Sequence, residues 1–559
     1  VTLICLQLLR YQVIGADERT LAAQPKDPAP RGVVVDARGT PLVVNRYFYQ
    51  ITATPSNIRS PEQRAQLAKD LEMTIGVPAA TTLENLTVNA ERMFTILADA
   101  VSPEDTQRLL DLKASQFQTE GYSPLQQVEA KPMARRFYPQ GTLTAHTVGF
   151  VRSDYGGITG IEEYYEQFLR ADGPGLLSTE RIALDTLAPQ VQRFLPSEVG
   201  KDLVLSMDRT MQWIAREELA RGIEEYGAQS GSVIVLEPNS GAILAMVNLP
   251  EYDPNRYQLA EHELFPNLAI SAQYEPGSVF KIITFGAGVD LGLLDHTTVF
   301  TDTGIHVIGG RNIFNANRVG YGEVNAADAL ARSLNVVTAQ IAELLGPEEF
   351  YQYVRLFGFG DATGVDLPGE IAGAVKTPNS PDWSLSDLGT NSFGQGLAVT
   401  PLQMANATAA IANEGILMRP YLVQARVTNG EVQTTEPTTM RRVLSPEAAN
   451  ALTEMMIWTV DNGSPRGRVP GYRVAGKSGT AQIPTPQGYI ERETIVSFVG
   501  FAPADEPAFV ILVKLDRPDP DIGIWAGETA APVFSRIAAR LLDYMQIAPD
   551  AIRTAQFGE

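Results

Sequence analysis

Apolar strand patterns lie at both ends of the segment that runs from about residue 207 to the end of the chain, and helical patterns fill the space between them. SGSVIVLEPNSGAILAMVNLP gives two apolar strands joined by a turn at 237–241, and SFVGFAPADEPAFVILVKLD gives strands again near residue 500. An amphipathic helix precedes the first pair, and residues 530–545 predict a helix after the second. The two ends must therefore meet in one sheet, which predicts an α+β domain.

The whole chain is long enough for more than this one domain. It has 559 residues, of which 44% are apolar, so two to four domains of ordinary size are expected. Near Met207 the sequence changes to a strong amphipathic helix followed by apolar strands. We place a boundary there, between domains of residues 17–200 and 201–559. The first of these domains shows no cluster of catalytic residue types.

Strand and helix patterns alternate in the first domain. RGVVVDARGTPLVVN predicts a β-hairpin that turns at 37–39, and RRFYPQGTLTAHTVGFV predicts an extended segment. Helices are predicted at 61–76, at 103–115 and, in a short form closed by glycine, within GGITGIEEYYEQFLRADGPG. Residues 181–208 predict strands and turns.

The opening fourteen residues, VTLICLQLLRYQVI, are mostly apolar. A helix needs ~20 apolar residues to cross a bilayer, so we expect residues 1–16 to be the remnant of an N-terminal membrane anchor. An ordinary amphipathic helix is the alternative. A polar, proline-punctuated linker follows as far as Gly32.

Composition excludes several classes of function. The formal net charge of −21 argues against nucleic-acid binding, which needs basic residues to contact phosphates. The single cysteine, Cys5, rules out an intrachain disulfide, and the four histidines show no H-x-x-x-H spacing. We therefore expect no structural metal and no cofactor.

The segment YEPGSVFK, residues 274–281, places a hydroxyl and an amine one helical turn apart. Pro276 and Gly277 interrupt what precedes them, so a buried helix should begin beside Ser278. The positive end of that helix would stabilise an oxyanion, and Lys281 could accept the serine proton. The alternative is an N-cap serine followed by a surface lysine.

A second pattern, GYRVAGKS at 471–478, satisfies the P-loop formula G-x-x-x-x-G-K-[ST]. A P-loop follows a buried strand and opens a helix, whereas here a polar stretch precedes and Gly479, Pro484 and Pro486 follow. The context argues against nucleotide binding.

The same lysine and serine fit a different set of motifs. Ser278-x-x-Lys281, Ser333-x-Asn335 and Lys477-Ser478-Gly479 occur in the order S-x-x-K, S-x-N, K-[ST]-G, with 55 positions between the two serines and 142 from Asn335 to Lys477. That set belongs to the acyl-transferring serine enzymes that react with penicillin. Each motif alone is weak, but the three in order make a strong signal.

The chain resembles the class B penicillin-binding proteins, which are monofunctional peptidoglycan transpeptidases. The resemblance is nearly end to end, with two departures: Ala37 where the family usually has arginine, and Ser478 where threonine is commoner. It implies an α+β transpeptidase domain with a mostly antiparallel sheet flanked by helices and a helical subdomain, behind an N-terminal β-rich elongated pedestal. The matching segments are RGVVVDARGTPL, RRFYPQGTLTAHTVGFV, GITGIEEYYEQFL, SGAILAMVNLPEYDPNRY, YEPGSVFKI, ARSLNVV, NSFGQGLAVTPLQMANA, GYRVAGKSGTAQ and SFVGFAPADEPAFVILVKLD.

The resemblance also implies a role for each motif residue. Ser278 would attack a D-Ala-D-Ala stem peptide and release D-Ala, and Ser333 would relay a proton to the leaving amine. Asn335 would orient Lys281 and bind the donor peptide. The N–H groups of Ser278 and Thr480 would form the oxyanion hole, while the hydroxyls of Ser478 and Thr480, on either side of Gly479, would hold the terminal carboxylate.

Lys281 can act as the base only if its ammonium loses its proton near neutral pH. Two lysines about 4 Å apart repel by about 4 kcal/mol at an effective dielectric near 20, and burial adds to this, so Lys281 and Lys477 should not both be cationic. We expect Lys281 to have the lower pKa and its amine to hydrogen-bond to the Ser278 hydroxyl. The turn at Gly394-Gln395-Gly396 is expected to shape the cleft rather than to take part in catalysis.

Other members of the wider group remain alternatives. A β-lactamase would need a residue that activates water for deacylation and has no use for a pedestal, whereas a D,D-carboxypeptidase would pass the acyl group to water. A β-lactam signal receptor or a silent scaffold would not need all of the motif residues that are intact here.

The expected partners follow from the resemblance. They are peptidoglycan stem peptides, β-lactam antibiotics and a membrane-embedded glycan polymerase, with the catalytic domain on the outer side of the inner (cytoplasmic) membrane behind a single membrane span. Elongation and division types share every catalytic motif, and the flanks of GITGIEEYYEQFL favour the division type.

Overall fold

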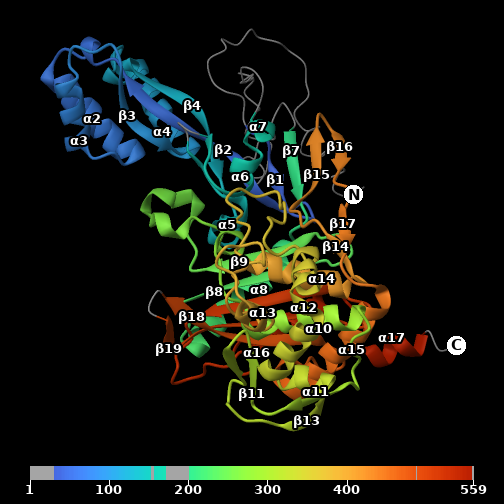
Figure 1. Ribbon diagram of the computed structural model, residues 1–559. Helices are drawn as coiled ribbons and strands as arrows, with labels where there is room; N and C mark the ends of the chain where they lie inside the picture. The colour runs from blue at the N-terminus through green and yellow to red at the C-terminus, as the bar shows by residue number, and fades with distance from the viewer. Residues whose placement is uncertain (1–30, 153–155, 171–200, 486–487, 557–559) are drawn as a thin grey trace.

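The structure is a computed structural model that describes residues 31–152, 156–170, 201–485 and 488–556 (Figure 1). The molecule is elongated: a large body of mixed helices and strands holds the C-terminus, a sheet-based pedestal stands on it, and a smaller head lies at the far end of the pedestal (Figure 1).

The body is built on one antiparallel sheet whose strands come from both ends of the C-terminal segment. β20 (Phe509–Asp516) pairs directly with β8 (Ser230–Leu236), which confirms the α+β domain predicted from the strand patterns. The full order is β18 (Ala475–Thr485), β19 (Gly488–Ala502), β20, β8 and β9 (Ile243–Leu249).

Helices cover both faces of this sheet because alternate side chains of each strand point to opposite faces. On one face, Val233 and Val235 share a core with helices α8 (Arg209–Tyr226) and α16 (Ala530–Tyr544). On the other, Ile234 and Leu236 belong to the larger core of the helical region.

The helical region holds the segments that carry the motifs. Its central helix, α14 (Pro401–Ala412), is buried along its whole length and begins with a capping box at Thr400. Two short β-ribbons, β10 (Val299–Asp302) with β13 (Gly322–Asn325) and β11 (Ile305–Ile308) with β12 (Arg311–Phe314), lie at its edge. The other main helices are α10 (Lys281–Asp290), α11 (Ala326–Ala331), α12 (Asn335–Leu356), α13 (Leu385–Asn391) and α15 (Pro446–Gly463).

The pedestal sheet contains strands from both halves of the chain. β7 (Lys201–Leu205) pairs with β1 (Val34–Val35) on one side and with β15 (Val423–Thr428) on the other. Val35, Val204, Ala425 and Val427 form a small core across these strands. The sheet order is β16 (Glu431–Thr434), β15, β7, β1, β2 (Pro41–Ala53) and β3 (Thr95–Val101), with β4 (Val128–Phe137) also on β2. Two strands that follow residue 400 thus complete the pedestal.

The head packs helices α2 (Pro61–Ile75), α3 (Ala79–Val88) and α4 (Pro103–Glu120) on the outer part of β2, β3 and β4. The predicted helices at 61–76 and 103–115 are therefore confirmed, as is the hairpin that turns at 37–39 between β1 and β2.

One prediction in the pedestal is wrong. The segment 135–151 is extended only as far as Phe137; it then forms the 3-10 turn η3 (Gly141–Thr144) and the short helix α5 (Ala145–Val148) before β5 (Val151–Arg152). Tertiary contacts override the strand pattern there, because α5 is buried against the body and the His146 ring hydrogen-bonds to the Leu264 carbonyl. The predicted short helix is present as α6 (Gly160–Tyr164) and α7 (Glu166–Leu169).

The expected anchor remnant, residues 1–16, and most of the predicted strands at 181–208 lie outside the described residues. Among the helices that the structure describes, each is too short or too polar to span a membrane.

Candidate active site

Ser278 lies on a 3-10 turn that leads directly into a buried helix. The turn η7 (Gly277–Phe280) is followed without a break by α10, and Lys281, the first residue of α10, lies one turn after Ser278. The helix predicted beside Ser278 is confirmed. The first N–H groups of a helix have no partner inside it, and here they belong to the turn, so the N–H of Ser278 can stabilise an oxyanion.

Three segments meet at Ser278 so closely that no side chain fits between them. The Gly277 N–H donates to the carbonyl of Gly394, and a Cβ on Gly394 would lie 2.2 Å from the Gly277 oxygen. A Cβ on Gly479 would lie 2.8 Å from the backbone nitrogen of Val279. Strand β18 and the turn at 394–396 therefore fix η7 from two sides.

Lys281 is completely buried, and its amine is bound to Ser333 rather than to Ser278. The Nζ donates to the Ser333 carbonyl at 2.5 Å and to the Ser333 hydroxyl at 3.1 Å. The expected direct hydrogen bond from Lys281 to Ser278 is absent among these contacts. Burial, followed by the charge of Lys477, lowers the pKa of Lys281 well below its usual value.

Lys477 approaches the same hydroxyl from the strand side. It is also completely buried, and its Nζ donates to the Ser333 hydroxyl at 3.1 Å and to the Ser478 carbonyl at 2.9 Å. Burial lowers the pKa of Lys477 to about 7. Ser333 thus bridges two buried amines whose protons are both held weakly.

Ser333 can reach both lysines because of its backbone conformation. It lies between α11 and α12 with φ 58°, a left-handed conformation that costs a residue with a side chain about 1–2 kcal/mol. Strain of this kind persists only where the surrounding structure holds it, and it is common at functional sites.

Asn335 is the first residue of α12 and lines the same cleft, but its side chain does not contact Lys281. Its amide donates to the carbonyl of Phe314 at 3.0 Å. No hydrogen bond from Asn335 to Lys281 therefore supports the expected role of Asn335 in orienting that lysine.

The residues of β18 alternate between the core and the cleft, as strand geometry requires. Lys477 and Gly479 are buried, while Ser478 and Thr480 line the cleft. The Ser478 hydroxyl is hydrogen-bonded to that of Ser464 at 3.0 Å, and the Thr480 hydroxyl accepts from the N–H of Ala526 at 3.1 Å. The P-loop pattern at 471–478 runs into this strand and not into a helix, so it forms no phosphate loop.

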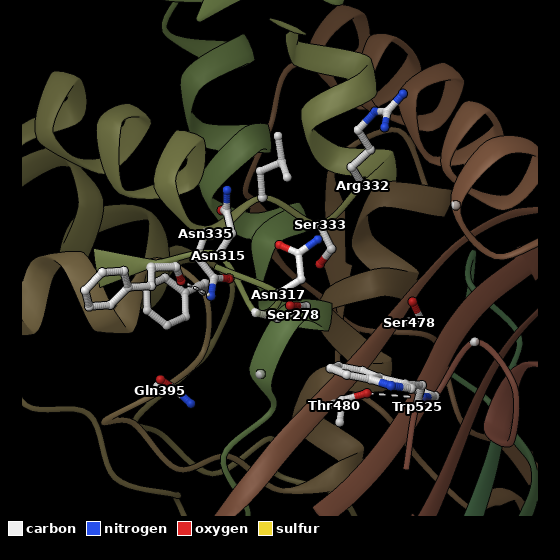
Figure 2. A pocket seen from close by; sticks show the side chains of 18 of the residues that line it. Ser278, Asn315, Asn317, Arg332, Ser333, Asn335, Gln395, Ser478, Thr480 and Trp525 are labelled. Atoms are coloured by element: carbon white, nitrogen blue, oxygen red, sulfur yellow. Dashed lines mark hydrogen bonds between the residues drawn. The ribbon is translucent and has the colours of Figure 1, made fainter. Parts of the chain in front are cut away.

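These elements enclose a cleft of about 930 Å³. Figure 2 shows Ser278 in its middle, with Ser333, Asn335 and Asn315 on one side and Thr480 and Trp525 on the other. Its walls include residues that sequence reasoning missed, because the fold alone brings them to the site: Arg311, Asn315, Arg318, Tyr321, Arg332, Arg466, Gln482, Tyr489 and Trp525.

The charge of the cleft is opposite to that of the chain. Four of its lining side chains are arginines, and Glu528 is the one acid among the described residues that line it. The chain as a whole has a formal net charge of −21. An anionic ligand would therefore be attracted to the cleft and repelled by much of the remaining surface.

No set of three His, Cys, Asp or Glu side chains that could hold a metal ion occurs in the described part of the chain. The polar groups around Ser278 and Ser333 are hydroxyls, amines and backbone N–H groups, the groups that serine acyl transfer uses.

Comparison with known proteins finds relatives that match nearly the whole chain. Residues 231–539 match the family model for the penicillin binding protein transpeptidase domain, and residues 26–205 match that for the penicillin-binding protein dimerisation domain. Peptidoglycan D,D-transpeptidase FtsI of Escherichia coli is 30% identical over 97% of this chain and 88% of its own length. Stage V sporulation protein D of Bacillus subtilis is 29% identical over 95% of this chain and 80% of its own length.

A solved structure shares the fold. Penicillin binding protein 3 from Mycobacterium tuberculosis, in a complex with aztreonam, superposes with a TM-score of 0.71 at 26% identity and covers 94% of this chain and 98% of its own.

Proposed function

This chain belongs to the class B penicillin-binding proteins, and from that premise we propose that it is a peptidoglycan D,D-transpeptidase that works through an acyl-enzyme on Ser278. The observation that supports this most strongly is the pair of buried lysines, Lys281 and Lys477, that share the hydroxyl of Ser333, with Lys281 one helical turn after Ser278. Two amines with lowered pKa values beside a nucleophile are what proton transfer at neutral pH requires.

The reaction has two halves. In the first, the Ser278 oxygen attacks the carbonyl carbon between the two D-Ala residues, and neutral Lys281 takes up its proton. The N–H groups of Ser278 and Thr480 stabilise the oxyanion, and the hydroxyls of Ser478 and Thr480 hold the terminal carboxylate. The C–N bond then breaks, and the proton passes through Ser333 to the amine of the leaving D-Ala.

In the second half, an amine from a neighbouring stem peptide attacks the ester on Ser278. It gives up a proton to the same base and forms the cross-link, which restores the Ser278 hydroxyl. Because Lys281 contacts Ser333 and not Ser278 in the ligand-free site, its amine must turn toward Ser278 when substrate binds, or act through the Ser333 hydroxyl. Apo geometry of this kind commonly tightens in the substrate complex.

The arginines of the cleft support an acidic donor. A stem peptide that ends in D-Ala-D-Ala carries at least its terminal carboxylate, and a cleft lined by Arg311, Arg318, Arg332 and Arg466 favours such a ligand. β-Lactam antibiotics, whose strained amide takes the place of the scissile bond, should acylate the same serine.

The site of action follows from the substrate. Peptidoglycan lies outside the cytoplasmic membrane, so we place the catalytic body there, attached through a membrane anchor to which residues 1–16 belong. We further propose that anchor and pedestal dock on a membrane-embedded glycan polymerase and that the protein serves division rather than elongation, a preference that rests on the GITGIEEYYEQFL segment. Co-purification of the full-length protein with a glycan polymerase, and its position in dividing cells, would test both points.

Two measurements separate a transpeptidase from the rival activities: turnover of a D-Ala-D-Ala stem peptide by the purified protein with and without an added amine acceptor, and recovery of the protein after treatment with penicillin. The proposal predicts D-Ala release together with a peptide cross-linked to the acceptor. Release of D-Ala with no cross-linked product at any acceptor concentration would indicate a carboxypeptidase. Rapid recovery from penicillin would indicate a β-lactamase, and acylation without any peptide turnover would indicate a receptor.

A further inference from the structure

A buried Asp–Asn pair lies at the wall of the cleft, on segments that contain none of the three motifs; Asn315 lines the cleft and Asp302 does not. Asp302 is the last residue of β10 and is 1% exposed; Asn315 follows β12 and is 3% exposed. The Asn315 side-chain amide donates to both carboxylate oxygens of Asp302, at 3.0 and 2.8 Å.

Asp302 fixes the loop that carries Asn315. Besides the amide, its carboxylate accepts the backbone N–H groups of Gly304 at 2.9 Å and Tyr321 at 3.2 Å. Asn315 in turn donates to the carbonyl of Val319 at 2.9 Å. One carboxylate therefore ties together both ends of the loop and the asparagine in its middle, away from solvent, where each lost hydrogen bond is costly.

The same asparagine caps the helix that begins at the S-x-N motif. The N-cap residue of α12 is Leu334, which has no side chain that can accept a hydrogen bond. Instead, the Asn315 side-chain oxygen accepts the N–H of Val336 at 3.1 Å, from a separate segment of the chain. The adjacent carbonyl of Phe314 accepts the side-chain amide of Asn335. Phe314, at the end of β12, and Asn315, which follows it, thus hold the first two residues of α12. Figure 2 shows Asn315 and Asn335 on the same side of the cleft.

Ser333 lies two residues before the first turn of α12, which Phe314 and Asn315 hold in place. Its left-handed backbone (φ 58°) is what lets one hydroxyl meet both Lys281 and Lys477. Relaxation of that strain would move Ser333, and movement of the first turn of α12 would permit the relaxation.

We propose that Asp302 and Asn315 are positioning residues for acyl transfer: they fix the start of α12 so that Ser333 bridges the two lysines and Asn335 faces the cleft. The inference rests on the proposed function, because it gives these residues a part in the acylation of Ser278. Neither residue touches the reacting atoms.

The test exchanges the two side chains. In Asn315→Asp, two carboxylates face each other, which breaks the pair. In Asp302→Asn, one side-chain oxygen can still accept from Asn315, but the new NH2 group faces the backbone N–H of Gly304 or Tyr321, so the pair is weakened. The double variant Asp302→Asn/Asn315→Asp restores one amide and one carboxylate across the same gap and keeps an acceptor for the N–H of Val336, although its new carboxylate faces the carbonyl of Val319. A variant Asn315→Ser, too short to reach Asp302, serves where a single exchange does not fold.

The measurement is the rate constant of acylation at saturating penicillin, calculated only for the fraction of molecules that finally becomes labelled. A merely structural role would reduce that fraction and leave the rate constant of the remaining molecules unchanged. We expect each broken pair to slow acylation about 10–100-fold, as a misplacement of roughly 1 Å can do. The exchanged double variant should be faster than Asn315→Asp, because the repulsion between two buried carboxylates is removed.

The matched control is Asp366→Asn. Asp366 also anchors a loop, by accepting the N–H groups of Leu422 and Val423 and the hydroxyl of Tyr165, and it lies outside the cleft. Its loss should lower stability without changing the acylation rate constant. The inference is overturned if the broken pairs acylate at the wild-type rate, or if the double variant is no faster than the slower single variant. Failure of the wild-type protein to take up penicillin would instead refute the proposed function.

Discussion

The chemistry of this site depends on the protonation of Lys281 and Lys477 and on the hydrogen bonds that both make to Ser333. Ser333 is hydrogen-bonded to both Lys281 and Lys477, and neither amine is accessible to water. Burial alone accounts for the lowered pKa of Lys477, while Lys281 is affected by burial and by the charge of its neighbour. Two causes therefore favour the neutral form of Lys281, which makes it the amine suited to act as the base.

This predicts the direction of the pH dependence. Acylation should be slow while Lys281 is protonated, should rise as the pH passes its lowered pKa, and should level off well below 10.5, the ordinary value for lysine. In Lys477→Met, a like charge is removed, so the pKa of Lys281 should rise and the midpoint of the pH profile should move to higher pH. Stopped-flow acylation over a range of pH measures this midpoint independently of the absolute rate.

Lys281→Arg tests the same residue without removing its charge. A guanidinium cannot lose its proton in this range, so acylation should fall by about 10²–10⁴, the usual contribution of a general base. Near-wild-type acylation by this variant between about pH 6 and 9 would show that Ser278 is activated in another way.

At the scale of elements, local sequence patterns predicted the features that depend on neighbouring residues along the chain. The helix at Ser278 and the sheet joined from distant strands follow from periodicity and turn residues. Lys477 was expected to border the cleft, but the alternation along β18 buries it completely and leaves Ser478 at the cleft. Contacts between distant segments were not predictable in this way. Nothing in the sequence around Asn315 signals that it caps a helix beginning twenty residues later, or that β15 completes the pedestal.

The close approach of the turn at 394–396 to η7 gives a prediction about an element. Gly394 has φ 80°, and a Cβ there would lie 2.2 Å from the Gly277 carbonyl oxygen, so Gly394→Ala must displace η7 and with it Ser278. We expect a loss of stability greater than the ~1–2 kcal/mol that the left-handed backbone alone would cost, and slower acylation.

Gly369→Ala is the matched control for this substitution. Gly369 has φ 78°, and a Cβ there meets nothing within 4 Å, so only the backbone cost applies. Thermal unfolding and acylation rates of the two variants distinguish the cost of an alanine in a left-handed backbone from the displacement of η7. Equal effects on both quantities would mean that the close contact does not position Ser278.

At the scale of the whole molecule, an acidic chain presents an arginine-lined cleft. The contrast between a net charge of −21 and a cleft with four arginines and one acid among its described lining residues should guide anionic stem peptides to Ser278. The pedestal is joined to the body through β7 and β15, so its sheet also connects distant parts of one chain.

The arginines therefore predict a dependence on salt. The second-order rate constant for acylation by an acidic stem peptide should fall as ionic strength rises, and Arg318→Gln/Arg466→Gln should lower it about tenfold at low salt and flatten the dependence. Arg108→Gln, in the head and bonded to Asp105, should change neither. A salt dependence that is the same in all three proteins would contradict this role.

The central claim is that Ser278 forms the acyl-enzyme, and mass spectrometry of the penicillin-treated protein tests it most directly. After digestion, we predict one added penicilloyl group, located on the peptide that contains Ser278, and no added mass on the Ser278→Ala variant folded to the same extent. Because no water-activating residue is evident among the described residues of the site, the adduct should persist through the digestion. An adduct on any other residue, or labelling that survives Ser278→Ala, would contradict the account.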